Sequence, residues 1–96
     1  MPTVKLTGYI QFPENTTADQ LADVSFELVK HSQLTLNEEG CISFSVTQSP
    51  INQLRFDVSE EFVDKSAFEF HQKRVKLSNW FLVSQNATRH YTIIDN

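Results

Sequence analysis

The chain has 96 residues, of which 40% are hydrophobic and 21% charged, with a formal net charge of −4 and a sequence pI near 5.2. This length suits one small globular domain, residues 1–96, rather than two domains or a disordered chain. The negative charge and the scattered Lys and Arg side chains argue against a nucleic-acid-binding protein, because recognition of phosphates needs a clustered basic surface.

The first two predicted elements are a strand and a long helix. Residues 4–12 alternate between apolar and polar side chains, a pattern typical of a half-buried strand. Thr17 and Gln20 have the spacing of a capping box, so we expect a helix to begin there. Its pattern continues to about Glu39, and Gly40 suits the left-handed residue that often closes a helix.

Two more strands and a second helix follow. Residues 41–48 and 53–62 both alternate and flank a turn rich in Pro and Asn, which predicts a hairpin. Asp64 is expected to cap a second helix that fades between Ser78 and Gln85. A final strand covers the segment RHYTII.

The order of these elements, βαββαβ, is that of a ferredoxin-like α+β fold. We expect a four-stranded antiparallel sheet with both helices on one face, toward which the apolar side of each strand points, Ile42 of the second strand included. The other face is mixed and carries Tyr9, Gln11, Ser43, Ser45, Arg55 and Asp57. Apolar residues that lie off the helix stripes indicate a partner surface: Phe26, Leu34, Phe70 and Leu77.

Cysteine usage and hydropathy bear on location. The single cysteine, Cys41, cannot form an internal disulfide, which fits a reducing cytoplasm. No apolar run is long enough to span a bilayer, and the first ten residues lack the apolar core of a signal peptide. We therefore expect a cytoplasmic protein that does not associate with membranes.

His71 lies on the apolar face of the second predicted helix. At about 100° per residue, Ala67, Phe68 and Val75 share its side of that helix. A histidine in this position is either a packed core residue, bonded to a backbone carbonyl or a nearby side chain, or the working group of a pocket. The pattern alone leaves both interpretations open.

Other chemistries have weaker support. His31, His71 and His90 come from different elements without the spacing of metal ligands, so no metal site is expected. Cys41 follows a helix end whose partial negative charge would raise the pKa of the thiol, which makes it a poor nucleophile. Three carboxylates in the third strand could pair for acid–base work, although solvated side chains are the simpler interpretation: Asp57, Glu60 and Glu61.

Two segments, LTLNEEGCISFSV and QLRFDVSEEFVDKSAFEFH, resemble the antibiotic biosynthesis monooxygenase family. The family has a helix that ends in Glu-x-Gly-Cys, a hairpin, and a helix with Ala-Phe-x-x-His, which correspond here to Glu38–Cys41 and Ala67–His71. The resemblance covers most of the chain. It implies a homodimeric α+β barrel in which two sheets face each other across the mixed surface, with a pocket between the sheet and the helices of each subunit.

The resemblance also implies a range of activities. Members with known activity oxidise phenolic or quinol compounds without metal, flavin or haem, while others degrade haem, isomerise a signalling sugar derivative or have no established activity. Haem degradation is disfavoured, because Phe62 stands where that branch has Trp, and the first strand offers Tyr9 and Gln11 but no Asn.

The function that the resemblance favours is a cofactor-independent monooxygenase acting on a phenolic or quinol-like small molecule. Such chemistry needs a base that deprotonates the substrate, and His71 is the candidate. Candidate substrate-binding residues are Tyr9, Gln11, Phe44, Phe62 and Phe68. Two alternatives stay open: a non-catalytic dimeric module with a small-molecule-binding or regulatory role, and an isomerase of a small polar metabolite.

Overall fold

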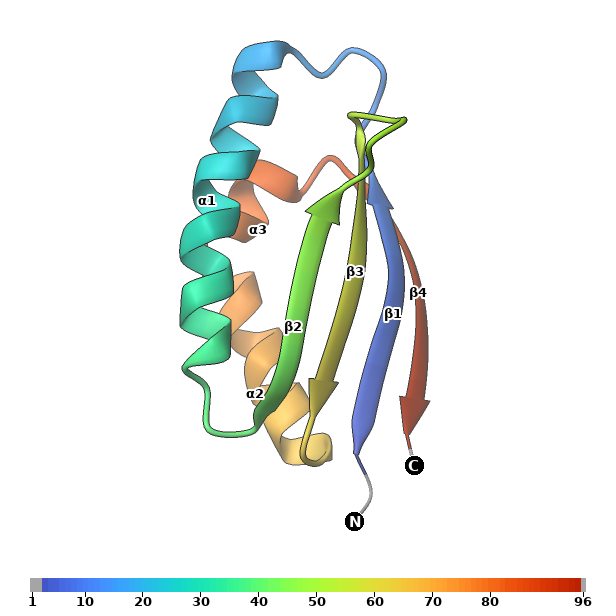
Figure 1. Cartoon of the computed structure of the whole chain (residues 1–96). Coiled ribbons are helices and arrows are strands. Elements are labelled where there is room, and N and C mark those ends of the chain that lie inside the picture. Colours follow the sequence, from blue (N-terminus) through green and yellow to red (C-terminus); the bar gives the residue numbers. More distant parts are fainter. Residues whose placement is uncertain (1–2, 96) are drawn as a thin grey trace.

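Four strands and three helices make up residues 3–95, the part of the chain that the computed structural model describes (Figure 1). The strands are β1 (Val4–Gln11), β2 (Cys41–Gln48), β3 (Arg55–Phe62) and β4 (Thr88–Asp95). The helices are α1 (Ala18–Leu36), α2 (Lys65–Lys76) and α3 (Asn79–Ser84). Residues 1, 2 and 96, the ends of the expected domain, lie outside the described part.

The strands form one antiparallel sheet in the order β2-β3-β1-β4. Figure 1 shows all three helices on the same face of this sheet. The arrangement confirms the predicted ferredoxin-like α+β fold. β4 is an edge strand, and all eight of its residues are exposed.

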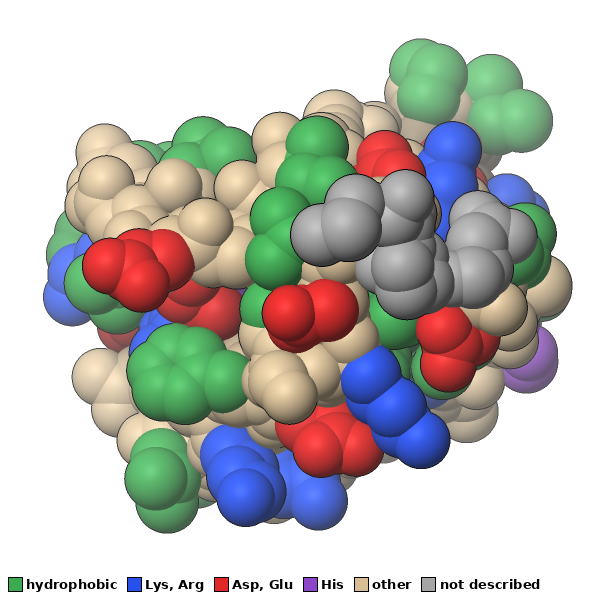
Figure 2. Space-filling model, turned by 90° about the horizontal axis from the view of Figure 1, so that it is seen from below, with side chains coloured by type: hydrophobic (Ala, Val, Ile, Leu, Met, Phe, Trp, Pro, Cys, Tyr) green, Lys and Arg blue, Asp and Glu red, His purple; other side chains and the backbone are tan. Residues whose placement is uncertain are grey.

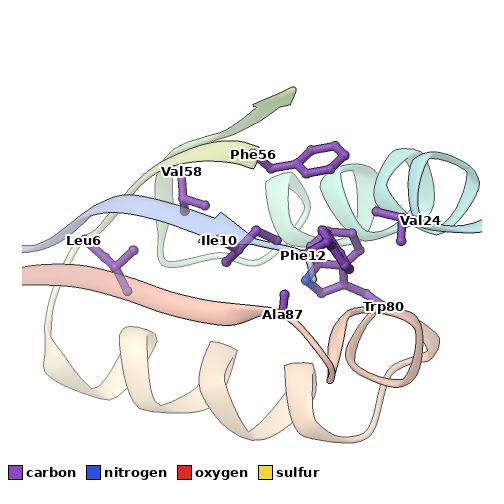
Figure 3. Close-up of a cluster of buried hydrophobic side chains, with 8 residues drawn as sticks. All are labelled: Leu6, Ile10, Phe12, Val24, Phe56, Val58, Trp80 and Ala87. Carbon is purple, nitrogen blue, oxygen red and sulfur yellow. The ribbon is translucent and has the colours of Figure 1, made fainter. Parts of the chain in front are cut away.

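The alternation of β1 and β3 determines which side chains enter the core. Val4, Leu6 and Ile10 of β1 are buried, as are Phe56 and Val58 of β3. Figure 3 shows how the main apolar cluster joins the inner side of these two strands to helices α1 and α3. Its buried members are Leu6, Ile10, Phe12, Val24, Phe56, Val58, Trp80 and Ala87.

Helix α1 begins as predicted but ends earlier. The Thr17 hydroxyl accepts a hydrogen bond from the Gln20 backbone, and the Gln20 side chain accepts one from the Thr17 backbone. The helix ends at Leu36 rather than near Glu39, because Asn37 caps it and donates its backbone N–H to carbonyls of the last turn.

Gly40 does not have the predicted left-handed conformation. Among the described residues, positive φ occurs at Gly8 only. Gly40 is needed for a different reason: a Cβ atom there would overlap the Cβ of Ala67. The turn after α1 therefore packs directly against α2, which brings the end of α1 close to the helix that carries His71.

The second predicted helix is in fact two helices. α2 ends at Lys76, and the Ser78 hydroxyl caps α3 by accepting a hydrogen bond from the Phe81 backbone at 3.2 Å. The same hydroxyl donates to the Val75 carbonyl at 2.6 Å, which fixes the turn between the two helices. No helix within residues 3–95 combines the length and the apolar character needed to cross a membrane.

The inward position predicted for Ile42 is wrong. A β-bulge between Cys41 and Ser43 shifts the register of β2 on β3, and Ile42 is 50% exposed. Phe44 and Val46 are half-buried, and Val46 packs against the core. The bulge adds one residue to β2, so the alternation of apolar residues does not continue through it.

Candidate functional site

His71 lies in a buried polar cluster between the sheet and the helices, and its side chain is 1% exposed. Its Nδ1 atom is 2.9 Å from Oε2 of Glu38, and Arg74 donates from Nε to the same oxygen at 2.8 Å. The guanidinium group balances the charge of the carboxylate, which can then accept both hydrogen bonds. This arrangement assigns the proton of the neutral imidazole to Nδ1 and leaves Nε2 as the basic nitrogen.

The second ring nitrogen faces another carboxyl group. Nε2 of His71 is 3.6 Å from Oε1 of Glu60 in β3, and Glu60 is 7% exposed. Burial, followed by the charge of Glu38, raises the pKa of Glu60 to about 7. The imidazole ring is thus held between two carboxyl groups, one at each nitrogen.

The expectation that Glu60 is solvated was wrong. Successive side chains of β3 alternate, so Glu60 shares the inner side with Val58 and Phe62. Asp57 lies on the other side of the strand and pairs with Arg55 at 2.9 Å, as expected for a more exposed carboxylate.

Burial lowers the pKa of His71. The hydrogen bond and the charge of Glu38 act in the opposite direction, while the charge of Arg74 lowers the pKa further. The lowered pKa gives a neutral imidazole at neutral pH. A neutral ring with a free Nε2 is the form that can accept a proton from a bound molecule.

His31 of α1 extends the cluster toward α3. It is 3% exposed, stacks on Trp80 at 5.5 Å between ring centroids, and lies 5.6 Å from the His71 ring. Burial, then the charges of His71 and Arg74, lower the pKa of His31 to about 3. The sequence signal for His31 is its four-residue spacing from Thr35, which is also buried and which places both residues on the inner side of α1.

The cluster around His71 contains buried polar atoms without hydrogen-bond partners. Within the described part of the chain, three buried side-chain atoms lack a hydrogen-bond partner: His31 Nδ1, Glu38 Oε1 and Glu60 Oε1. All three residues surround His71. Buried polar groups without partners are costly and rare, and a concentration of them next to shifted pKa values is typical of a functional site.

Two of the predicted aromatic residues contact His71. Phe62 lies 5.0 Å and Phe44 6.1 Å from the His71 ring, measured between centroids. Phe68 packs edge-on against Phe62 at 5.8 Å and so lies behind the first aromatic wall. The structure therefore brings these three residues together with His71.

Tyr9 and Gln11 lie on the opposite face of the sheet. Tyr9 stacks on His90 at 4.6 Å and holds the Arg55 guanidinium 3.9 Å above its ring. Gln11 accepts a hydrogen bond from Asn52 at 3.2 Å. Because neighbouring side chains of a strand point to opposite faces, these residues do not meet His71 within one chain, and their position agrees with the outer face predicted for them from the alternation of the first strand.

An open groove of about 760 Å³ lies next to the polar cluster, between the end of α1, the following turn and α2. Its apolar lining includes Leu34, Val63 and Phe70, and its polar lining includes Glu38 and Arg74. Figure 2 views the end of the molecule at which α1 ends and α2 begins, where apolar side chains are interspersed with acidic and basic ones. The groove reaches the two partners of His71, not the ring itself.

The described residues offer no arrangement for metal or thiol chemistry comparable to the histidine–carboxylate cluster. In the segment from residue 3 to residue 95, no group of three or more His, Cys, Asp or Glu side chains is arranged to hold a metal ion. Burial, then the charges of Glu38 and Glu60, raise the pKa of the free Cys41 thiol. The direction agrees with the expectation for Cys41, but buried carboxylates contribute rather than a helix end alone.

The ferredoxin-like fold and the histidine–carboxylate cluster define a small α+β domain with its candidate site between sheet and helices. The model of the family described as antibiotic biosynthesis monooxygenase matches residues 5–81, well over half of the chain. The chain belongs to this family, as the sequence motifs indicated. No curated protein matches the sequence significantly.

Solved structures share the fold over nearly the whole chain. A conserved protein from Methanosarcina mazei has a TM-score of 0.77 at 20% identity, covering 98% of this chain and 92% of its own. A protein of unknown function from Bacteroides thetaiotaomicron, described as a possible oxidoreductase, has a TM-score of 0.73 at 15% identity, covering 98% and 97%. A protein from Nitrosomonas europaea, provisionally named an antibiotic biosynthesis monooxygenase, has a TM-score of 0.71 at 14% identity, covering 99% and 88%.

Proposed function

We propose that the protein is a cofactor-independent monooxygenase that acts on a phenolic or quinol-like small molecule, with His71 as the base. Family membership supports the monooxygenase class. The observation that carries the proposal is the hydrogen bond on one side of the imidazole: Glu38 binds Nδ1 at 2.9 Å, and Nε2, which faces Glu60 at 3.6 Å without a hydrogen bond, is the nitrogen that can take a proton. Phe44 and Phe62 provide flat apolar walls beside the ring.

The chemistry follows from deprotonation. Nε2 of His71 takes the hydroxyl proton, and the resulting phenolate is electron-rich enough to pass an electron to dioxygen. Oxidation of a phenol to a quinone requires no external reductant, because the substrate supplies the electrons. One oxygen atom of dioxygen enters the ring, and the other leaves as water with two hydrogen atoms from the substrate.

The groove beside α2 is the approach that this proposal uses; it ends at Glu38 and Arg74, and His71 does not line it. Because these two side chains hold the Nδ1 side of the ring, the proposal requires them to move aside before a substrate reaches Nε2. The apolar lining by Leu34, Val63 and Phe70 suits the body of an aromatic molecule, and the volume of about 760 Å³ is in the range of small-molecule sites.

Oxygen consumption tests the proposal. Metal-stripped protein is supplied with a panel of quinols and naphthols, and uptake is compared between wild type, His71→Ala and Lys73→Ala. Lys73 is the control because it is an exposed residue of the same helix and does not line the groove. We expect wild type and Lys73→Ala to accelerate uptake and folded His71→Ala not to. Equal acceleration by all three proteins would remove His71 from the chemistry.

A second candidate function is an isomerase of a small polar metabolite. The convergence of Glu38, Glu60 and His31 on His71 favours it, because isomerisation needs one group to remove a proton and another to return it. An isomerase would exchange substrate hydrogen with deuterated solvent in the absence of oxygen. The non-catalytic alternative predicts ligand binding with neither exchange nor oxygen uptake.

We also propose that the chain forms a homodimer through the outer face of the sheet and that it is cytoplasmic. Support for the dimer comes from the mixed character of that face, which carries the Tyr9–His90 stack and the Arg55–Asp57 ion pair. The free Cys41 fits a reducing compartment.

Light scattering after gel filtration tests the dimer. Ser59 lies near the middle of the sheet, on the side of β3 opposite to Val58. We expect Ser59→Arg to yield monomers, and Glu69→Arg on the exposed surface of α2 to remain dimeric. A monomeric wild type would contradict the proposal.

A further inference from the structure

We infer that Glu60 is the proton-holding partner of His71. Below neutral pH, the proton between Oε1 of Glu60 and Nε2 of His71 resides on the carboxyl group, so the pair consists of a neutral acid beside a neutral base. The inference concerns the resting protein, and only its consequence for turnover rests on the proposed function.

The position of Glu60 gives its carboxyl group few partners. It lies in β3 between Leu6 of β1 and Phe44 of β2, which are its neighbours across the sheet. Its Oε1 atom is buried without a hydrogen bond. Among the described residues, His71 is the one basic group within 4.0 Å of it, at 3.6 Å. An ionised carboxylate in this place would have little solvent and no fixed cation beside it.

Glu38 is the contrasting case. Its carboxylate accepts hydrogen bonds from His71 and Arg74 and has its charge balanced by the guanidinium group. Arg74 also donates from Nη2 to Thr35 at 2.8 Å, so its position is fixed away from Glu60. With Glu38 negative, Arg74 positive and His71 neutral, the cluster is neutral as long as Glu60 keeps its proton.

Burial decides which member of the pair holds that proton. It lowers the pKa of His71 and raises the pKa of Glu60 to about 7, which reverses the usual order of an imidazole and a carboxylic acid. Transfer of the proton to His71 would create two ions in a site that solvates neither. Opposite shifts in adjacent groups are the pattern by which acid and base roles are assigned in enzymes.

The other titratable groups around Glu60 do not supply a compensating cation. His31 of α1 has its pKa lowered to about 3 and is uncharged. Burial raises the pKa of Cys41 in β2, and Glu38 and Glu60 raise it further. Tyr91 of β4 cannot supply a cation, because a phenol ionises to an anion. Burial raises its pKa, Arg89 lowers it, and the charge of Glu60 raises it.

During turnover, the pair would exchange protons without changing its total charge. When Nε2 of His71 accepts the hydroxyl proton of a substrate, the new positive charge makes Glu60 a stronger acid. Glu60 then releases its own proton, which joins the oxygen atom that leaves as water, and the substrate proton on His71 passes to Glu60 and restores the resting pair. One proton enters the cluster and one leaves, so no net charge is buried.

Nuclear magnetic resonance of substrate-free protein tests the inference. Glutamate carboxyl carbons and histidine ring nitrogens are labelled and titrated with pH in wild type, Glu60→Gln and Glu61→Gln. Glu61 is the matched control because it is the next carboxylate in β3 and belongs to the other side of the strand. We expect one carboxyl carbon to titrate near pH 7 in wild type and Glu61→Gln and to be missing in Glu60→Gln. At pH 7 the His71 ring should carry a proton on Nδ1 only.

Titration of Glu60 in the ordinary glutamate range, or a doubly protonated His71 at pH 7, would overturn the inference. These resonances are read without substrate, so the result is independent of whether the protein consumes oxygen. If it does, the rate of Glu60→Gln should lose the pH dependence near 7 that Glu61→Gln keeps. A rate lowered equally at every pH would overturn the role of Glu60 in turnover, whereas the resonances alone decide the inference on the resting protein.

Discussion

Replacing Glu60 by Gln is expected to make the stability of the protein less sensitive to rising pH. The pKa of Glu60 is raised from 4.5 to about 7 in the folded state. Between these values the folded chain holds a proton that the unfolded chain has lost, so stability is full below pH 4.5 and is lost as pH rises through about 7. At about 1.36 kcal/mol for each pKa unit, the total loss is about 3 kcal/mol.

Urea unfolding at about pH 5 and about pH 8 measures this effect. Wild type should lose about 2 kcal/mol from Glu60 between the two conditions, and Glu60→Gln should not, so their difference in unfolding free energy shifts by that amount. His31 and His71 titrate in all the proteins and largely cancel. Glu61→Gln should behave as wild type. If the unfolding free energies of Glu60→Gln and wild type differ by the same amount at both pH values, Glu60 is not a buried, protonated carboxyl group in the folded protein.

Three further substitutions test other parts of the structure. Wild type should become less stable by about 2 kcal/mol between about pH 7 and pH 5 because of His31, and His31→Phe should not show this loss. The reason is that unfolded His31 takes up a proton in this range, whereas folded His31, with a pKa of about 3, does not. Circular dichroism across the acid transition measures the difference. Gly40→Ala should cost about 1–3 kcal/mol through overlap with Ala67, and Ala67→Gly should restore the loss; lack of rescue in thermal unfolding would contradict the contact. Asp64→Ala should cost about 1 kcal/mol in urea unfolding, because Asp64 accepts the first backbone hydrogen bond of α2 at 2.8 Å; no change would argue against this cap.

Much of the fold was predictable because its signals are local. The period-two alternation of β1 and β3 and the caps at Thr17 and Asp64 depend on neighbouring residues only. The break at Ser78 was missed although its signal is local, a serine that bonds the Val75 carbonyl and caps α3. The bulge at Ile42 was missed because it depends on how β2 meets β3. Local patterns contain no information about such contacts.

The candidate site was predicted only in part. His71, Phe44 and Phe62 were predicted from their place on apolar faces, and the structure brings them together. Tyr9 and Gln11 lie on the outer face, as their alternation indicates, and their role in substrate binding stays a prediction.

The carboxyl groups beside His71 were harder to find. Counting along β3 from Val58 places Glu60 on the inner side, but a carboxylate is rarely buried, and no neighbouring residue marks it. Glu38 belongs to the family motif at Glu38–Cys41, but the motif does not indicate its contact with His71, which lies 33 residues further along the chain. The chemistry of the site depends on these long-range pairings.

Oxygen-isotope labelling tests whether this chain inserts oxygen with His71 as the base. Metal-stripped wild type, His71→Ala and a protein-free control are incubated with the quinol and naphthol panel under ¹⁸O₂, and the product masses are measured by mass spectrometry. We expect a product with one ¹⁸O atom that forms faster with wild type than in the control, and at the control rate with folded His71→Ala. Products that match the protein-free control in amount and label for every compound, or a His71→Ala variant as active as wild type, would contradict this expectation.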